Sequence, residues 1–94
     1  MKNDNSLIPA MVISPGESIQ EELEARGWTQ RQLAKKMGRP VRAVSEIIRG
    51  KRAISGLLAL DLAAAFGTSA EMWIGMEARY RLHLARQQRQ RKSA

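Results

Sequence analysis

The sequence has no cysteine, a single histidine and few aromatic residues. Without cysteine, a disulfide scaffold, a cysteine nucleophile and a thiolate-bound zinc site are all excluded. One histidine excludes a metal site built from several histidines and gives no support to a Ser-His-Asp arrangement. Aromatic residues make up 4% of the 94 residues, which disfavours an all-β sandwich and an aromatic stacking platform for bases. We therefore expect no metal, no cofactor and no enzymatic activity.

The sequence also has no long hydrophobic run. The longest apolar region, residues 57–66, is interrupted by Asp61 and is far short of the roughly 20 residues that span a membrane. The start of the chain is polar, and the apolar residues 7–13 do not end in a signal-cleavage pattern. A length of 94 residues is enough for one hydrophobic core. These features predict one cytoplasmic domain without membrane contact.

Positive charge is abundant and unevenly distributed. The net charge is +7, yet residues 26–52 alone hold nine basic residues and one acidic residue, a local charge of +8. Residues 1–25 hold one basic and five acidic residues, and residues 77–94 hold six basic and one acidic. Charge concentrated in one stretch is typical of a binding surface rather than of general solubility. The partner is expected to be anionic.

Residues that start and stop helices recur along the chain. Two capping boxes, residues 14–17 and 29–32, place a hydroxyl side chain three positions before Glu or Gln. Glycines follow the expected helix ends. No stretch alternates apolar and polar residues, so no strand is expected. The sequence predicts an all-α fold with five helices at about residues 15–26, 30–37, 41–49, 56–66 and 70–88.

These boundaries divide the chain into a helical domain and two terminal segments. Residues 14–86 are expected to form the domain, with Trp73 and Ile74 in its core. Residues 1–13 are predicted to be a flexible arm that either is disordered or docks on a partner. Residues 87–94 carry no apolar side chain until Ala94 and are predicted to be a frayed basic tail. This tail either is solvated or touches DNA or RNA.

The second and third predicted helices are short and are joined by Gly38-Arg39-Pro40 inside the basic stretch. Two short helices joined by a tight turn are typical of a helix-turn-helix, whose second helix enters the DNA major groove. Arg42, at the front of that helix, can bind guanine O6 and N7. The carboxylate of Glu46 can accept a hydrogen bond from the cytosine N4 amino group, or it can hold the Arg42 side chain in position. The alternative is an ordinary surface pair four residues apart, but the local charge favours contact with DNA.

We call the third predicted helix the reader helix. The residues around it are suited to binding phosphates. The start of the second helix presents free backbone N–H groups beside Gln30, which is a favourable arrangement for an anion. Basic and hydroxyl side chains flank the reader helix and are expected to position it on the DNA backbone. The predicted backbone contacts are Thr29, Gln30, Arg31, Arg39, Ser45, Arg49, Lys51 and Arg52.

Apolar residues continue along the fifth helix beyond the part that a four-helix core can cover. Met76, Tyr80 and Leu84 follow one another at four-residue spacing. The alternative is that they complete the core. Because the far end of this helix has little left to pack on, we predict that these three residues form a homodimer contact.

Several segments resemble a known family. Residues 27–34, GWTQRQLA, resemble the opening of the Xre or lambda-repressor-like helix-turn-helix, and residues 44–52, VSEIIRGKR, resemble its VSEILNGKR segment. Two flanks are more specific. Pro15-Gly16-Glu17 resembles the HPGE start of HigA-type (VapI-type) antitoxins, and residues 67–80, GTSAEMWIGMEARY, resemble their GTSPEFWLNLQANY segment. The resemblance covers about residues 13–84.

The resemblance implies a five-helix lambda-repressor-like domain with an extended C-terminal helix. It also implies a homodimer that binds double-stranded DNA at a palindromic operator, represses its own operon and neutralises a HigB-like toxin, a RelE-like ribonuclease that cleaves mRNA. The base-reading positions of the family fall on Val41, Arg42 and Glu46. Three positions depart from the family pattern: Pro40 at the cap of the reader helix, Gly56 and Gly75.

Two other functions remain open on the sequence. One is a stand-alone Xre-type repressor without a toxin partner, which would have the same DNA-binding residues. The other is a protein that binds RNA or sequesters a toxin through its basic surface without reading DNA sequence. The effect of Arg42→Ala on specific and on random DNA separates this last protein from the antitoxin and the stand-alone repressor, which both read DNA sequence.

Overall fold

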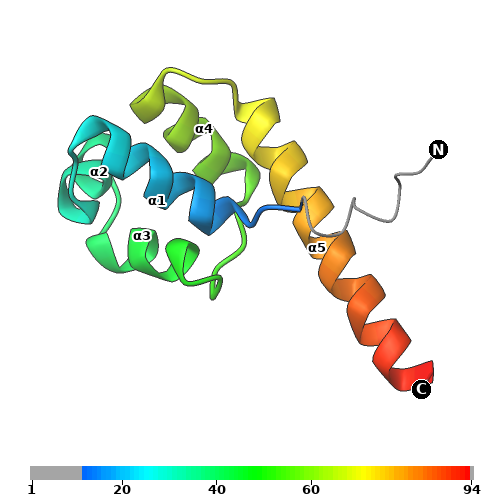
Figure 1. The fold of residues 1–94 in the computed structure, drawn as a ribbon. Helices are drawn as coiled ribbons and strands as arrows, with labels where there is room; N and C mark the ends of the chain where they lie inside the picture. Colours follow the sequence, from blue (N-terminus) through cyan, green and yellow to red (C-terminus); the bar gives the residue numbers. More distant parts are fainter. Residues whose placement is uncertain (1–11, 94) are drawn as a thin grey trace.

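Five α-helices follow one another in the computed structural model, which describes residues 12–93 (Figure 1). Helices α1 (Pro15–Arg26), α2 (Gln30–Met37), α3 (Val41–Ile48) and α4 (Gly56–Phe66) surround the core, and α5 (Ala70–Ser93) packs against α4 and α1. No strand occurs within the described residues. The predicted all-α, five-helix class is therefore confirmed. Most of the predicted arm, residues 1–13, lies outside the described residues.

Side-chain caps start four of the helices where the sequence predicts them. Thr29 and Gln32 form the complete capping box, with reciprocal backbone-to-side-chain hydrogen bonds of 3.1 and 2.8 Å. Ser14 and Ser55 each accept one hydrogen bond from the backbone three residues on. At α5 the sequence leaves Thr68 and Ser69 as alternatives. The hydroxyl of Ser69 accepts from the Met72 N–H at 3.0 Å, so Ser69 is the cap.

The core lies between the four shorter helices and the first half of α5. Trp73 is completely buried, and its indole Nε1–H donates to the Thr68 hydroxyl at 2.8 Å. Phe66 lies between Trp73 and Trp28, with ring centroids 5.8 Å apart in each pair. The expectation that Ile74 is a core residue is wrong, because Ile74 is 40% exposed. Neighbouring residues on a helix point about 100° apart, and of these two it is Trp73 that faces the core.

Helix α1 crosses α3 at very close range beside Gly16. A β-carbon built on Gly16 would lie 2.3 Å from the carbonyl oxygen of Ile48 and 2.8 Å from that of Ile47. Both of these are backbone atoms, so only glycine allows this approach. The Pro-Gly-Glu flank therefore fixes how closely α1 packs on the end of the reader helix.

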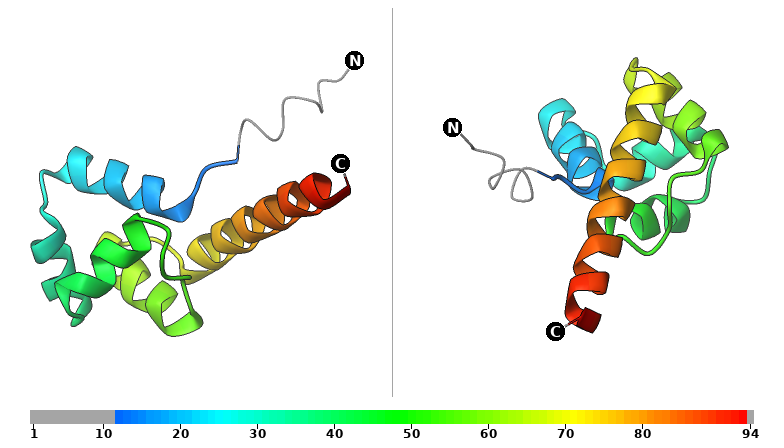
Figure 2. Two further views of the ribbon diagram at one scale, coloured as in Figure 1. Left: turned by 90° about the horizontal axis from the view of Figure 1, so that it is seen from below. Right: turned by 90° about the vertical axis from the view of Figure 1, so that its right-hand side faces the viewer.

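Helix α5 is longer than the sequence predicts. It continues to Ser93, five residues past the expected end at Gln88 and through the segment expected to fray. Residues 87–92 are glutamine, arginine and lysine, which form helices readily, and no glycine or proline interrupts them. Without apolar residues this segment cannot pack on the core, but its helix propensity is unchanged. The second half of α5 projects away from the other helices (Figures 1 and 2).

Candidate nucleic-acid interface

Helices α2 and α3 form the predicted two-helix unit. Val44 and Ile47 bury the inner face of α3 against the core. The outer face presents Arg42, whose side chain is 85% exposed, together with Val41 at 38% and Arg49. Because Val44 and Ile47 face the core, α3 presents an opposite, mainly polar face that is free to enter a groove.

Glu46 holds two arginines at the centre of this face. Its carboxylate accepts from Arg42 Nε at 3.2 Å and from Arg52 Nε and Nη2 at 2.9 and 2.6 Å. The hydrogen bond from Arg52, with a smaller contribution from Arg42, lowers the pKa of Glu46 below its ordinary value. Only 20% of the Glu46 side chain remains exposed. Of the two roles predicted for Glu46, this arrangement matches the one in which it holds Arg42 in position.

Arg52 is the partner that sequence reasoning missed. It lies in the connection after α3, six residues from Glu46, where no helical spacing predicts a contact. Its two hydrogen bonds to one carboxylate oxygen tie the connection to the reader helix. The Arg52 guanidinium, predicted to contact the DNA backbone, therefore stands beside Arg42 at the same face.

Arg39 also has a partner within the chain. Its Nε donates to the carboxylate of Asp61 at 2.7 Å, which links the α2–α3 turn to α4. The signal in the sequence is that Asp61 is the one acidic residue in the apolar stretch 57–66. The ion pair orients the turn. The predicted contact of Arg39 with the DNA backbone would therefore come from a guanidinium that already donates to Asp61.

The start of α2 provides the predicted anion-binding geometry only in part. The Thr29 hydroxyl accepts from the Gln32 N–H, so this hydroxyl is engaged in the cap. Gln30 and Arg31 begin the helix, where backbone N–H groups lack a partner in the preceding turn. Arg31 is exposed, as are Lys51 and Arg49 at the far end of α3. Arg49 and Lys51 directly follow the helix that carries Arg42, and Arg31 lies at the start of the other helix of the unit.

The three predicted dimer residues differ in how much surface they leave free. Met76 packs against the core, while Tyr80 and Leu84 are partly exposed on α5. A second apolar surface was missed by sequence reasoning: Leu57 and Leu60 on α4 are 67% and 59% exposed. They lie on the side of α4 opposite Leu58 and Leu62, which point into the core.

Two other kinds of site do not occur in the part of the chain that the structure describes. Within residues 12–93, acidic, histidine and cysteine side chains nowhere gather in a group of three that could hold a metal ion. In the same residues, no helix is long and apolar enough to cross a membrane.

Comparison with known proteins places the two-helix unit among helix-turn-helix proteins. The Helix-turn-helix family model matches residues 19–73. Virulence-associated protein I of Dichelobacter nodosus is 37% identical over 79 residues, which cover 83% of this chain and 73% of that protein. A HigA-family addiction module antidote protein from Coxiella burnetii has a TM-score of 0.79 at 35% identity, covering 86% of this chain and 89% of that one. The Pseudomonas aeruginosa antitoxin HigA with higBA promoter has a TM-score of 0.80 at 29% identity, covering 86% and 89%.

Proposed function

Because this chain belongs to the Xre-like helix-turn-helix family and its structural neighbours are HigA-type antitoxins, we propose that it is a sequence-specific DNA-binding antitoxin. It binds a palindromic operator as a homodimer, represses its own operon and neutralises a HigB-like, RelE-like toxin that cleaves mRNA. The observation that carries the DNA-binding part is the outer face of α3, where the exposed Arg42 is held by Glu46.

The electrostatics of the two-helix unit support this proposal. The +8 charge of residues 26–52 lies on the last residue of α1, on α2 and α3, and on the turns between and after them. Backbone phosphates supply a large share of DNA affinity, and contacts with base edges supply specificity. Arg31, Lys51 and Arg49 are suited to the first task and Arg42 to the second. Val41 and Glu46 remain the other two predicted base-reading residues.

Substitution of Arg42 by alanine tests sequence reading. If Arg42 binds a guanine, the loss is about 1–3 kcal/mol on the operator and much smaller on random DNA of the same length. Arg31→Ala is the matched control, since the removal of a phosphate-binding side chain weakens both complexes alike. An equal loss on the two DNAs for Arg42→Ala would show that the protein does not read sequence through this face.

The antitoxin part needs a separate experiment. The chain is coexpressed with the adjacent open reading frame, and we expect the two products to copurify and the chain to restore growth. The exposed acidic side chains of α1, Glu17, Glu21 and Glu24, lie on a helix that is not part of the two-helix unit and are suited to a basic ribonuclease. Failure to bind or to rescue, with operator binding intact, would identify a stand-alone repressor.

A further inference from the structure

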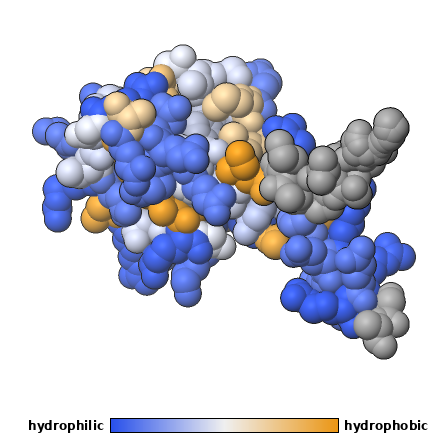
Figure 3. Space-filling view, in the orientation of Figure 1, coloured by the Kyte–Doolittle hydropathy of each residue, from blue (hydrophilic) through white to orange (hydrophobic). Residues whose placement is uncertain are grey.

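The far end of α5 carries charge of one sign. Residues 78–93 contain six basic and no acidic side chains. Four of the basic residues, Arg86, Arg89, Arg91 and Lys92, lie within seven positions, and all four are exposed. We call these four residues the basic end of α5. On the face seen in Figure 3, the projecting end of the helix is hydrophilic.

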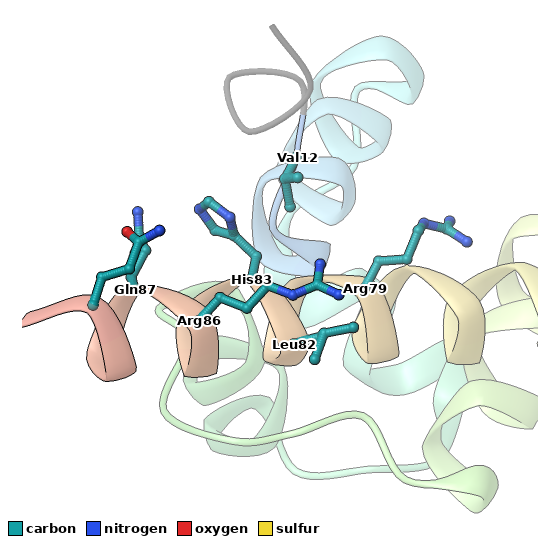
Figure 4. A pocket seen from close by; sticks show the side chains of 7 residues that line it. Val12, Arg79, Leu82, His83, Arg86 and Gln87 are labelled. Carbon is teal, nitrogen blue, oxygen red and sulfur yellow. The ribbon is translucent and has the colours of Figure 1, made fainter. Parts of the chain in front are cut away.

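Helix stability alone explains only part of this charge. Basic residues in the last turn interact favourably with the negative end of the helix dipole, and Arg91 and Lys92 lie there. Arg86 lies before that turn, where the effect has faded. It lines a groove of about 320 Å³ together with Arg79, Leu82 and His83, and Val12 projects toward the helix from the opposite side (Figure 4). Arg79 and Arg86, seven positions apart, therefore lie on the same side of α5, and the basic end begins at Arg86.

The direction of α5 places this charge on the side of the molecule where the reader helix lies. In Figure 1, α3 forms the lower left edge of the helical body, and α5 runs down the right-hand side of the body and extends below the level of α3. The right-hand view of Figure 2, turned by 90°, shows the same extension past α3. A DNA duplex that lies along this lower edge and extends toward α5 would pass beside the basic end of α5.

We propose that the basic end of α5 binds DNA backbone phosphates that the reader helices do not touch. This inference rests on the proposed function, since it needs the protein on an operator. The chemistry favours duplex phosphates: arginine and lysine separated by glutamine supply donors suited to phosphate oxygens. The sequence has no aromatic residue after Tyr80, so this end has no platform on which single-stranded RNA bases could stack.

The test compares the full chain with the triple variant Arg86→Gln, Arg91→Gln and Lys92→Gln. The triple change Gln87→Ala, Gln88→Ala and Gln90→Ala is the matched control, because it alters the same turns of α5 without changing charge. Operator affinity is measured over a range of salt concentrations, and the phosphates that the protein binds are mapped by ethylation interference. Circular dichroism verifies that both variants keep their helix content.

The charge variant is expected to lose affinity equally on operator and on random DNA. Its slope of log affinity against log salt falls by about 0.9 for each phosphate that the variant no longer binds, or about 2.7 for three phosphates in a protomer. A subset of phosphates disappears from its interference pattern, while the phosphates dependent on Arg31 and Lys51 remain. The glutamine control keeps the full pattern.

Two results would overturn the inference. One is an unchanged interference pattern and salt slope in the charge variant. The other is a loss confined to an oligoribonucleotide used as competitor, which would identify RNA as the ligand. These results differ from failure of the proposed function, in which the unaltered chain itself shows no preference for its operator and Arg42→Ala changes nothing.

Discussion

At the scale of single residues, Glu46 determines how the reader face is arranged. Its carboxylate accepts three hydrogen bonds from two arginines, one on its own helix and one beyond it. Arg42 would otherwise sample many rotamers, because its side chain is 85% exposed. An arginine held before DNA arrives loses less conformational entropy on binding a base.

The pKa of Glu46 reports this arrangement directly. Arg52 is the largest cause of the lowered pKa, so Arg52→Ala is expected to raise the pKa of Glu46 toward its ordinary value. Arg42→Ala should raise it less. A depressed carboxyl pKa stabilises the fold above the ordinary pKa, and this contribution is lost as pH falls through the lowered value. An NMR titration measures the pKa of the Glu46 carboxyl in the unaltered chain, in Arg52→Ala and in Arg42→Ala. A larger rise of this pKa in Arg42→Ala than in Arg52→Ala would contradict the expected order.

At the scale of elements, the crossing of α1 over α3 depends on Gly16. Gly16→Ala places a methyl group against the carbonyl oxygens of Ile47 and Ile48, which are fixed by the backbone of α3. The helices have to separate, at a cost of about 1–3 kcal/mol in the free energy of unfolding, typical of overpacking. Urea denaturation measures this cost.

Gly56→Ala is the control for that experiment, because no atom lies within 4 Å of a β-carbon at Gly56. The control should match or exceed the stability of the unaltered chain. Equal stability of the two alanine variants would mean that the close approach at Gly16 is not a constraint. Since α3 carries Arg42, Gly16→Ala is also expected to weaken operator binding, whereas Gly56→Ala is not.

Gly75 is a third glycine whose substitution has a predictable effect, opposite in sign to that of Gly16. It lies in the second turn of α5, and the nearest atom to a β-carbon there is the guanidinium Nη1 of Arg79 at 3.3 Å. This atom is the flexible end of an exposed side chain and can move aside. Gly75→Ala should therefore stabilise the protein by about 0.5–1 kcal/mol. A thermal melt checks this, and a lowered Tm would show that α5 needs glycine at this position.

At the scale of the whole molecule, an apolar surface on α5 and another on α4 are suited to contact a second copy. One is the predicted surface on α5, where Tyr80 and Leu84 are partly exposed. The other is formed by Leu57 and Leu60 on α4. A palindromic operator requires two reader helices about one helical turn of DNA apart, ~34 Å, so the surface used sets the spacing of the half-sites.

We expect the double change Tyr80→Ser and Leu84→Ser to raise the dimer Kd at least about tenfold, the equivalent of 1.4 kcal/mol. The double change Leu57→Ser and Leu60→Ser should leave the Kd unchanged. Sedimentation equilibrium measures both variants. If only the double change Leu57→Ser and Leu60→Ser dissociates the dimer, the interface lies on α4. Operator binding should weaken in whichever variant dissociates, because a single protomer on one half-site binds poorly.

The sequence by itself determined the helices and the placement of charge. Hydroxyl caps and glycines act within a few residues of themselves, so the starts of α1, α2, α4 and α5 follow from local pattern. The start of α3 follows from Pro40. The concentration of basic residues on α2 and α3 is likewise a property of the sequence. The local signal fails at the end of α5, where the helix continues although apolar residues are absent.

Only the tertiary structure decided which distant groups meet. Arg52 reaches Glu46, Arg39 reaches Asp61, and Gly16 approaches the carbonyl of Ile48, although nothing in their spacing predicts these contacts. The direction in which α5 leaves the body is likewise visible only in the tertiary structure. These features depend on how helices cross, and crossing is set by the shapes of packed side chains from separate segments. Local pattern thus located the reader helix and its Arg42–Glu46 pair, and the tertiary structure brought Arg52 to the same carboxylate.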